Sequence, residues 1–159
     1  MRILALDLAT KTGWAIIGDD GSVIESGVQD FSKRRGESNG LMYMRFRKWL
    51  AGMHLMADGR NGLLIGYERP HHRGGAATSL LNNLAGRVEE HAATHNAEYF
   101  QVPPNTLKKW ATGKGNCGKL EIMEKASEIV GYEITSDDEA DAIMIGLYGF
   151  EQYCVANHE

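Results

Sequence analysis

The chain has 159 residues, of which 43% are hydrophobic and 24% are charged, a composition typical of one globular domain covering residues 1–159. Actin-like ATPases need two such domains, so this length argues against that class. The sequence has no apolar run near the roughly 20 residues of a membrane helix and no signal-peptide cleavage region, so we expect a cytoplasmic protein with no membrane contact. The formal net charge of −4 argues against a nucleic-acid partner unless metal is bound, since two divalent cations would add four charges and leave the complex formally neutral.

The chain opens with an apolar run, Ile3 to Leu6, which has no polar face and predicts a central strand covered on both sides. Asp7 follows it, and because an unpaired buried carboxylate is costly, we expect this acid to be paired, hydrogen-bonded or bound to metal. A turn at 10–13 and the apolar segment 14–17 predict a second strand hairpinned to the first. Polynucleotidyl transferases of the ribonuclease H-like fold begin in this way, and so do sugar-kinase and actin-type ATPases.

The remaining chain predicts alternating strands and helices. In chain order we expect a strand at Ser22–Phe31, a helix at Leu41–Ala57, a strand at Leu63–Tyr67, a helix at Thr78–Ala97 and a strand at Glu98–Val102. Three further helices follow, at Thr106–Ala111, at Gly118–Val130 and from about Asp137. We expect Asn105 to cap the first of these, and Ser136 to cap the last, with Glu139 reaching back to Ser136. Together these elements predict an α/β fold of the ribonuclease H-like type. Its five-stranded mixed sheet would have the first three strands antiparallel and helices on both faces.

Carboxylates recur where these elements begin or end. Glu68 follows a predicted strand as Asp7 does, and Asp138 and Asp141 lie three residues apart on one face of the last helix. For either helix acid alone, the helix dipole is a sufficient explanation. As a cluster, the four acids would repel one another unless divalent cations were bound, and all-oxygen ligands suit Mg²⁺ or Mn²⁺. We therefore expect these four acids to be catalytic and to hold two Mg²⁺ ions per active site, with Mn²⁺ as a substitute, because such a pair can activate water at a phosphodiester.

Basic and imidazole side chains gather in three further segments. We expect contacts with DNA from Arg34, Arg35, Arg69, His71, His72, Arg73, Lys108, Lys109, Lys114 and Lys119. For the first two segments the alternative is an ordinary solvated loop. The Walker spacing GxxxxGK[ST] is absent, so no nucleotide cofactor is expected.

The helix at 78–97 has a broader apolar stripe than one contact with a strand needs. This breadth predicts the centre of a two-fold homodimer, formed by Leu80, Leu81, Leu84 and Val88.

The segments LALDLATKTGWA, IGYE, VPPNTLKKWATGKGNCGK and DDEADAIMIG carry a specific resemblance along essentially the whole chain. The chain resembles the RuvC family of Holliday junction resolvases, and its short length and loop sequences look most like the bacteriophage branch. The resemblance implies that Asp7, Glu68, Asp138 and Asp141 match the catalytic acids. It also implies that Lys114 and Lys119 lie in a DNA-contacting segment and that a dimer makes paired nicks in opposing strands of a four-way junction. One departure is the loop 69–73, RPHHR, which stands where bacterial members carry an aromatic wedge.

The expected function is therefore metal-dependent resolution of Holliday junctions, in DNA recombination, repair or phage genome processing. Two alternatives remain: a nuclease of forks, flaps or structured RNA with the same fold, and a module that binds junctions without cutting them. The second alternative predicts a missing acid, and none of the four acids is missing.

Overall fold

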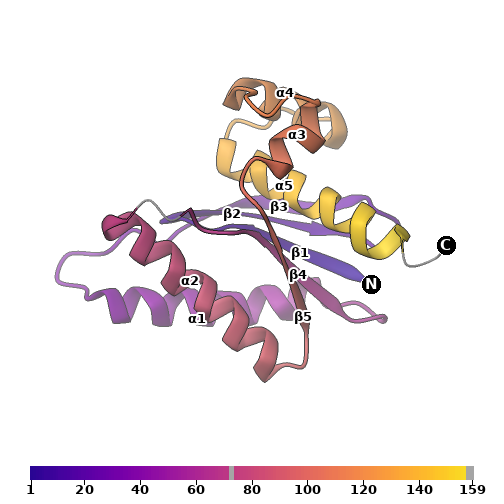
Figure 1. The fold of residues 1–159 in the computed structure, drawn as a ribbon. Helices are drawn as coiled ribbons and strands as arrows, with labels where there is room; N and C mark the ends of the chain where they lie inside the picture. The colour runs from indigo at the N-terminus through magenta and orange to yellow at the C-terminus, as the bar shows by residue number, and fades with distance from the viewer. Residues whose placement is uncertain (72–73, 157–159) are drawn as a thin grey trace.

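The computed structural model describes residues 1–71 and 74–156, which form one five-stranded sheet with helices on both faces (Figure 1). The strands are β1 Arg2–Asp7, β2 Lys11–Ile17, β3 Val23–Asp30, β4 Leu63–Glu68 and β5 Glu98–Val102. The helices are α1 Asn39–Ala57, α2 Gly75–Thr94, α3 Thr106–Thr112, α4 Lys119–Val130 and α5 Asp137–Gly149, which continues into a π-helical segment, η1 Phe150–Val155. The strand order is β3-β2-β1-β4-β5.

Antiparallel pairing joins β1, β2 and β3, whereas β4 runs parallel to both β1 and β5. The predicted mixed sheet with three antiparallel strands first is thus confirmed. Strand β5 has the predicted bounds. Helix α2 is shifted towards the N-terminus, since it begins and ends three residues earlier than the predicted helix at 78–97. Among the residues described, no helix combines the length and the apolar character needed to cross a bilayer.

Two separate cores lie on the two faces of the sheet (Figure 1). On one face, α1 and α2 pack on the sheet through Phe46, Leu50, Leu84, Val88, Leu4, Leu6 and Ile65. On the other face, α5 packs on it through Ala140, Ile143, Met144, Ala5, Ala15 and Ile17, and α3 and α4 stack beyond α5. Both cores are built from the apolar residues whose spacing predicted the elements.

The position of Leu84 and Val88 corrects the expected dimer interface. Leu84 is 1% exposed and Val88 is 0% exposed, and both belong to the core between α2 and the sheet. They are therefore not available to a second copy of the chain. Helical periodicity marks a buried face, but it does not distinguish a face that meets its own sheet from one that meets a partner.

The structure confirms one predicted capping hydrogen bond and lacks two others. Asn105 has a φ of 71° and makes no side-chain cap hydrogen bond, since its left-handed backbone, which Asn tolerates, directs the chain into α3 instead. Ser136 does cap α5, its hydroxyl accepting from the backbone N–H of Glu139 at 3.5 Å. The Glu139 carboxylate does not reach back, because it accepts a 2.7 Å hydrogen bond from Ser26 on β3 and so ties α5 to the sheet.

Candidate active site at the carboxylate cluster

Two of the predicted acids lie next to each other at one edge of the sheet. Strands β1 and β4 are parallel neighbours, and their register pairs Leu6 with Tyr67. Asp7 and Glu68 are the next residues of the two strands, so both come at the edge where the buried strands end. Both side chains are half-buried, and both line one pocket.

Helix α5 brings the other two acids to the same edge. Asp141 lines the pocket together with Asp7 and Glu68, and Asp138 is hydrogen-bonded to Asp7 through their carboxyl groups. The spacing of three residues places Asp138 and Asp141 on one side of the first turns of the helix. The structure therefore assembles the four predicted acids from three elements that lie far apart in the sequence.

Burial and mutual repulsion raise the pKa values of these acids. Burial raises the pKa of Asp7 well above its ordinary value, and the charges of Asp141, Asp138 and Glu68 raise it further. Burial, and then the charge of Glu68, raise the pKa of Asp141 to about 6. The pKa values of Glu68 and Asp138 are also raised, mainly by burial. The cluster therefore favours protons or cations over four free negative charges.

The donor set suits a hard divalent cation, because carboxylate oxygens are the ligands that Mg²⁺ and Mn²⁺ prefer. Across residues 1–71 and 74–156, however, no three Asp, Glu, His or Cys side chains are disposed to hold a metal ion as they stand. Asp7, Glu68 and Asp141 thus line the pocket without converging on one point, and Asp138 lies beside it against Asp7. Their raised pKa values and shared pocket are the observations that fit a metal site.

Comparison with known proteins finds relatives and solved structures along most of the chain. No family model matches the sequence. The crossover junction endodeoxyribonuclease RuvC of Rickettsia prowazekii is 25% identical over 163 residues, covering 91% of this chain and 94% of that protein. The solved structure of Thermus thermophilus RuvC in complex with Holliday junction substrate matches with a TM-score of 0.77 and 16% identity, covering 92% and 91% of the two chains. The chain has the fold of RuvC.

A viral protein shares this RuvC fold more distantly. The Fowlpox virus resolvase, solved with substrate Holliday junction DNA, matches with a TM-score of 0.57 and 13% identity, covering 94% of this chain and 98% of that one. The predicted ribonuclease H-like architecture is confirmed by these matches.

Three of the predicted DNA contacts line the carboxylate pocket. Arg69, His71 and Lys108 line it, and His71 Nε2 lies 3.6 Å from a carboxylate oxygen of Glu68. The charge of Lys108 lowers the pKa of Glu68 and so opposes the effect of burial. Basic side chains at the acids would be close to any phosphate that enters the pocket.

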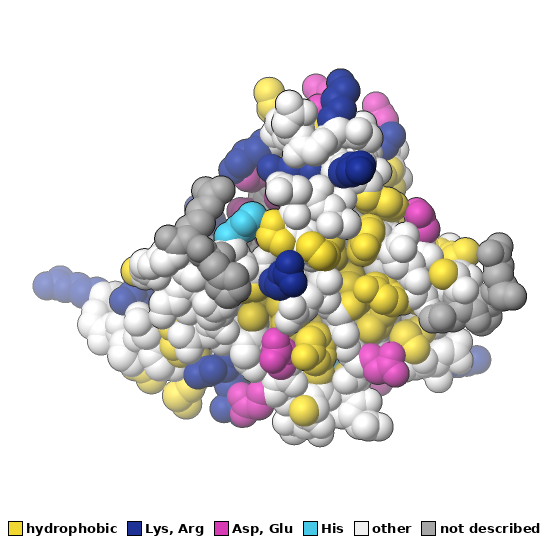
Figure 2. All heavy atoms as spheres, in the orientation of Figure 1, with side chains coloured by type: hydrophobic (Ala, Val, Ile, Leu, Met, Phe, Trp, Pro, Cys, Tyr) yellow, Lys and Arg dark blue, Asp and Glu magenta, His cyan; other side chains and the backbone are white. Residues whose placement is uncertain are grey.

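The other predicted contacts among the described residues do not line the pocket, although the charge of Lys119 is close enough to Asp138 to lower its pKa. Lys109 and Lys114 are exposed at α3 and the loop after it, and Figure 2 shows basic side chains over the α3–α4 region. The Lys119 ammonium donates a 2.5 Å hydrogen bond to Asp137, at the start of α5. Arg34 and Arg35 are exposed in the loop before α1. The predicted contacts His72 and Arg73 lie outside the described residues.

Sequence reasoning missed one basic neighbour of the acids. The charge of Lys11, the first residue of β2, acts on Asp138 and lowers its pKa. No motif marks this lysine, and only the antiparallel β1–β2 pair brings it beside the acids.

A buried polar network behind Glu68 was also missed. The Tyr67 hydroxyl donates a 2.7 Å hydrogen bond to Glu89 on α2 and accepts a 2.7 Å bond from the Gln101 amide on β5. Tyr67 is 0% exposed. The network joins three elements one residue before Glu68, and it holds the end of β4 in place.

The two predicted interface residues that are not in the core lie near the site. Leu81 lines the carboxylate pocket. Leu80 lines a neighbouring pocket with Tyr43 and Lys33. Both are half-buried within the chain, so any surface that they offer to a second copy is small.

Proposed function

We propose that this chain is a metal-dependent endonuclease that resolves Holliday junctions. One observation carries the proposal: in a chain with the fold of RuvC, carboxylates from β1, β4 and α5 meet in one basic-rimmed pocket at a sheet edge. The relatives reported above are bacterial and poxviral. We infer the affiliation with the bacteriophage branch from the loop sequences.

In this proposal the four acids hold two Mg²⁺ ions, for which Mn²⁺ substitutes. Bound ions would lower the pKa of an attacking water and stabilise the charge on the leaving oxygen of a phosphodiester. The chain itself contributes position: β1 and β4 fix Asp7 and Glu68, and the first turns of α5 fix the other two acids. Lys108 and Arg69 would attract and orient a DNA phosphate beside the acids.

Resolution of a four-way junction requires two cuts, so the proposal includes a homodimer in which residues 1–159 act as one nuclease domain in each copy. Leu80 and Leu81 remain candidate contacts at the start of α2. The exposed lysines of α3 and the following loop would contact phosphates of the junction arms.

The test is cleavage of labelled four-way junction, fork, flap and structured RNA substrates with Mg²⁺ and with EDTA. We expect Mg²⁺-dependent, paired cuts in opposing strands of the junction. Asp141→Asn supplies the matched control, since it removes one charge while it keeps the size of the side chain. If forks, flaps or RNA were cut faster than the four-way junction, that nucleic acid would be the substrate instead of the Holliday junction. Binding without cutting by the intact chain would overturn it in favour of a binding module.

A further inference from the structure

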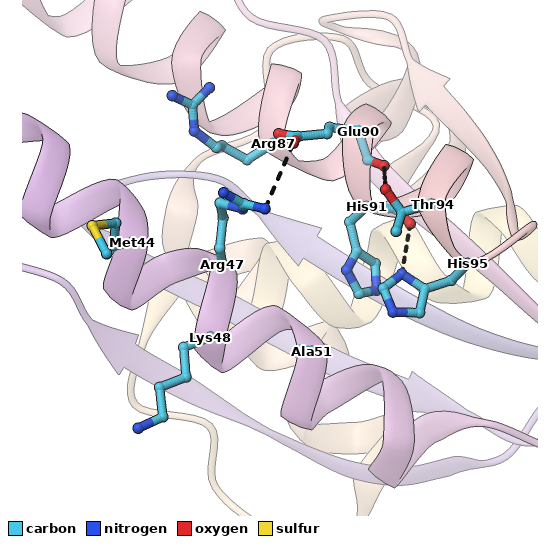
Figure 3. Close-up of a pocket in the computed structure, with 9 residues that line it drawn as sticks. All are labelled: Met44, Arg47, Lys48, Ala51, Arg87, Glu90, His91, Thr94 and His95. Carbon is cyan, nitrogen blue, oxygen red and sulfur yellow. Dashed lines mark hydrogen bonds and ion pairs between the residues drawn. The ribbon is translucent and has the colours of Figure 1, made fainter.

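Three histidines meet at the end of the helix pair α1 and α2. His54 belongs to α1. His91 and His95 lie one turn apart on α2, and Figure 3 shows the rings of these two side by side. His54 Nδ1 lies 3.0 Å from His91 Nε2. The ring centroids of His91 and His95 are 4.0 Å apart, and those of His54 and His95 are 5.0 Å apart.

This group of three histidines, the histidine cluster, is remote from the acids. His54 and His95 line a pocket with Asp58 and with Leu63, the first residue of β4. Glu68 is the last residue of the same strand, and a strand of 6 residues is about 17 Å long. The histidine cluster therefore lies at the opposite edge of the sheet from the proposed nuclease site.

Hydrogen bonding assigns the free nitrogen of one imidazole. His95 Nδ1 lies 2.9 Å from the backbone carbonyl oxygen of His91, which can only accept, so Nδ1 carries the proton. In a neutral ring the other nitrogen, Nε2, then has its lone pair available.

We propose that His54, His91 and His95 bind one late first-row divalent metal ion, with Zn²⁺ as the ion to test and Asp58 as the fourth ligand. Two imidazole nitrogens that bind tetrahedral Zn²⁺ are roughly 3.3 Å apart, since each Zn–N bond is about 2.05 Å. The observed 3.0 Å between His54 Nδ1 and His91 Nε2 is a hydrogen bond, so the ring that donates must move its proton to its other nitrogen before both can bind the ion. The distance itself then needs an adjustment of only a few tenths of an ångström. His91 and His95 add the i, i+4 spacing that places two imidazoles on one helix face.

The chemical state of the imidazoles agrees with this assignment. Burial lowers the pKa of His91 to about 4 and also lowers that of His54. Both rings are therefore neutral at neutral pH, which is the form that binds metal. Imidazole nitrogen suits Zn²⁺, Ni²⁺ or Cu²⁺ better than Mg²⁺, so the histidine cluster and the acids select different ions.

Binding requires one side-chain movement. Within the described part of the chain, no three donors converge on a point as they stand, so the exposed ring of His95 must turn towards the other two and give up the hydrogen bond of its Nδ1 to the His91 carbonyl. Arg47 and Lys48 line the pocket on the other side of the histidines, but Arg47 is paired with Glu90 at 3.6 Å (Figure 3). Asp58 provides the opposing negative charge on the open side.

The test is isothermal titration of ZnCl₂ into the protein in excess Mg²⁺, which keeps Zn²⁺ from the acids. We expect one Zn²⁺ per chain, with affinity reduced about tenfold or more in His54→Asn and in His95→Asn. His71→Asn, which removes an imidazole beside Glu68, is the matched control and should bind as the wild type does.

Thermal unfolding provides the second measurement. Zn²⁺ should raise the unfolding midpoint of the wild type, because it would link α1 to α2, and it should not raise that of His95→Asn. His95 is exposed, so this variant should match the wild type in circular dichroism without zinc. Three results would overturn the proposal: no Zn²⁺ binding, equal affinity in the wild type and His95→Asn, or zinc that is displaced as Mg²⁺ is raised.

Discussion

Gly13 and Asp138 are in direct backbone contact: a Cβ atom added to Gly13 would lie 1.8 Å from the carbonyl oxygen of Asp138. The first turn of α5 thus rests on the backbone of β2, with no side chain between them. This contact sets the position of the start of α5 relative to β2, and with it the positions of Asp138 and Asp141, because both acids belong to that helix.

Replacement of Gly13 by Ala should therefore impair catalysis. The added methyl must push the start of α5 away from β2, and a displacement of about 1 Å at a catalytic group can cost on the order of 100-fold in rate. We expect junction binding to persist, as measured by gel shift beside single-turnover cleavage. Gly52→Ala in α1 is the control, since nothing lies within 4 Å of the position of its Cβ. Equal activity in both variants would show that α5 adjusts without cost.

Asp138→Asn should separate binding from chemistry. The change removes one charge and little volume, so turnover should fall by orders of magnitude while junction affinity stays equal or increases. Asp137→Asn is the neighbouring control. It breaks an ion pair with Lys119, whose side chain is 81% exposed, and such pairs contribute little. An inactive Asp137→Asn beside an active Asp138→Asn would place the metal on the other side of α5.

The metal-free protein should lose stability as the acids ionise. An acid whose pKa is raised by folding binds more protons in the native state, so its contribution to the free energy of unfolding falls as pH rises between about 4 and about 6, the folded pKa of Asp141. Without metal, Asp141→Asn should therefore melt at a higher temperature than the wild type near neutral pH. This advantage should disappear near pH 4.

The histidine cluster changes stability in the opposite direction on acidification, because the lowered pKa values of His54 and His91 make their protonation unfavourable in the fold. Both proteins share the histidines, so the difference in unfolding temperature between the wild type and Asp141→Asn reports on the acids alone. Mg²⁺ should stabilise the wild type more than the variant near neutral pH, as scanning calorimetry would measure. An equal effect of Mg²⁺ on both proteins would argue against Asp141 as a ligand.

Lys114→Ala should weaken binding of all branched DNAs about equally and lower the slope of log affinity against log salt by roughly one charge. Lys119→Ala should lower it less, because the Lys119 ammonium is already paired with Asp137. Lys48→Ala on α1 serves as the control, since α1 lies on the face opposite to α5. Fluorescence anisotropy over a range of salt concentrations measures the slopes. An unchanged slope for Lys114→Ala would remove this lysine from the interface.

Tyr67→Phe should lower the free energy of unfolding by about 1–3 kcal/mol, because Glu89 and Gln101 lose the buried hydroxyl that joins them. Tyr99→Phe is the matched control: Tyr99 stacks on Tyr67 but is 44% exposed, so its change should fall within about 0.5 kcal/mol. Urea denaturation measures both values. Equal, small losses would mean that water replaces the Tyr67 hydroxyl.

The position of the acids was predictable from the sequence because strand ends leave a local signal. Asp7 and Glu68 each follow an apolar run, and parallel strands place such ends at one edge of the sheet. Ser136 marked the start of α5 in the same local way.

Contacts between distant segments leave no such signal. His54 and His91 are 37 residues apart, and neither lies in a recognisable motif. Leu84 has the apolar spacing of an interface residue, although its partner is the chain's own sheet. The contact of Gly13 with Asp138 depends on how closely a helix packs on a strand, which residue spacing does not encode.

The order of the elements along the chain also affects the time at which the site forms. Asp7 belongs to the first strand and pairs early with β2, whereas Asp138 and Asp141 belong to the last α-helix. A ribosome adds about 5–20 residues per second and releases the N-terminal segments first. Asp7, Glu68 and the basic segments before α5 therefore leave the ribosome before the acid set is complete, and the proposed DNA-cutting centre stays inactive until α5 has been synthesised.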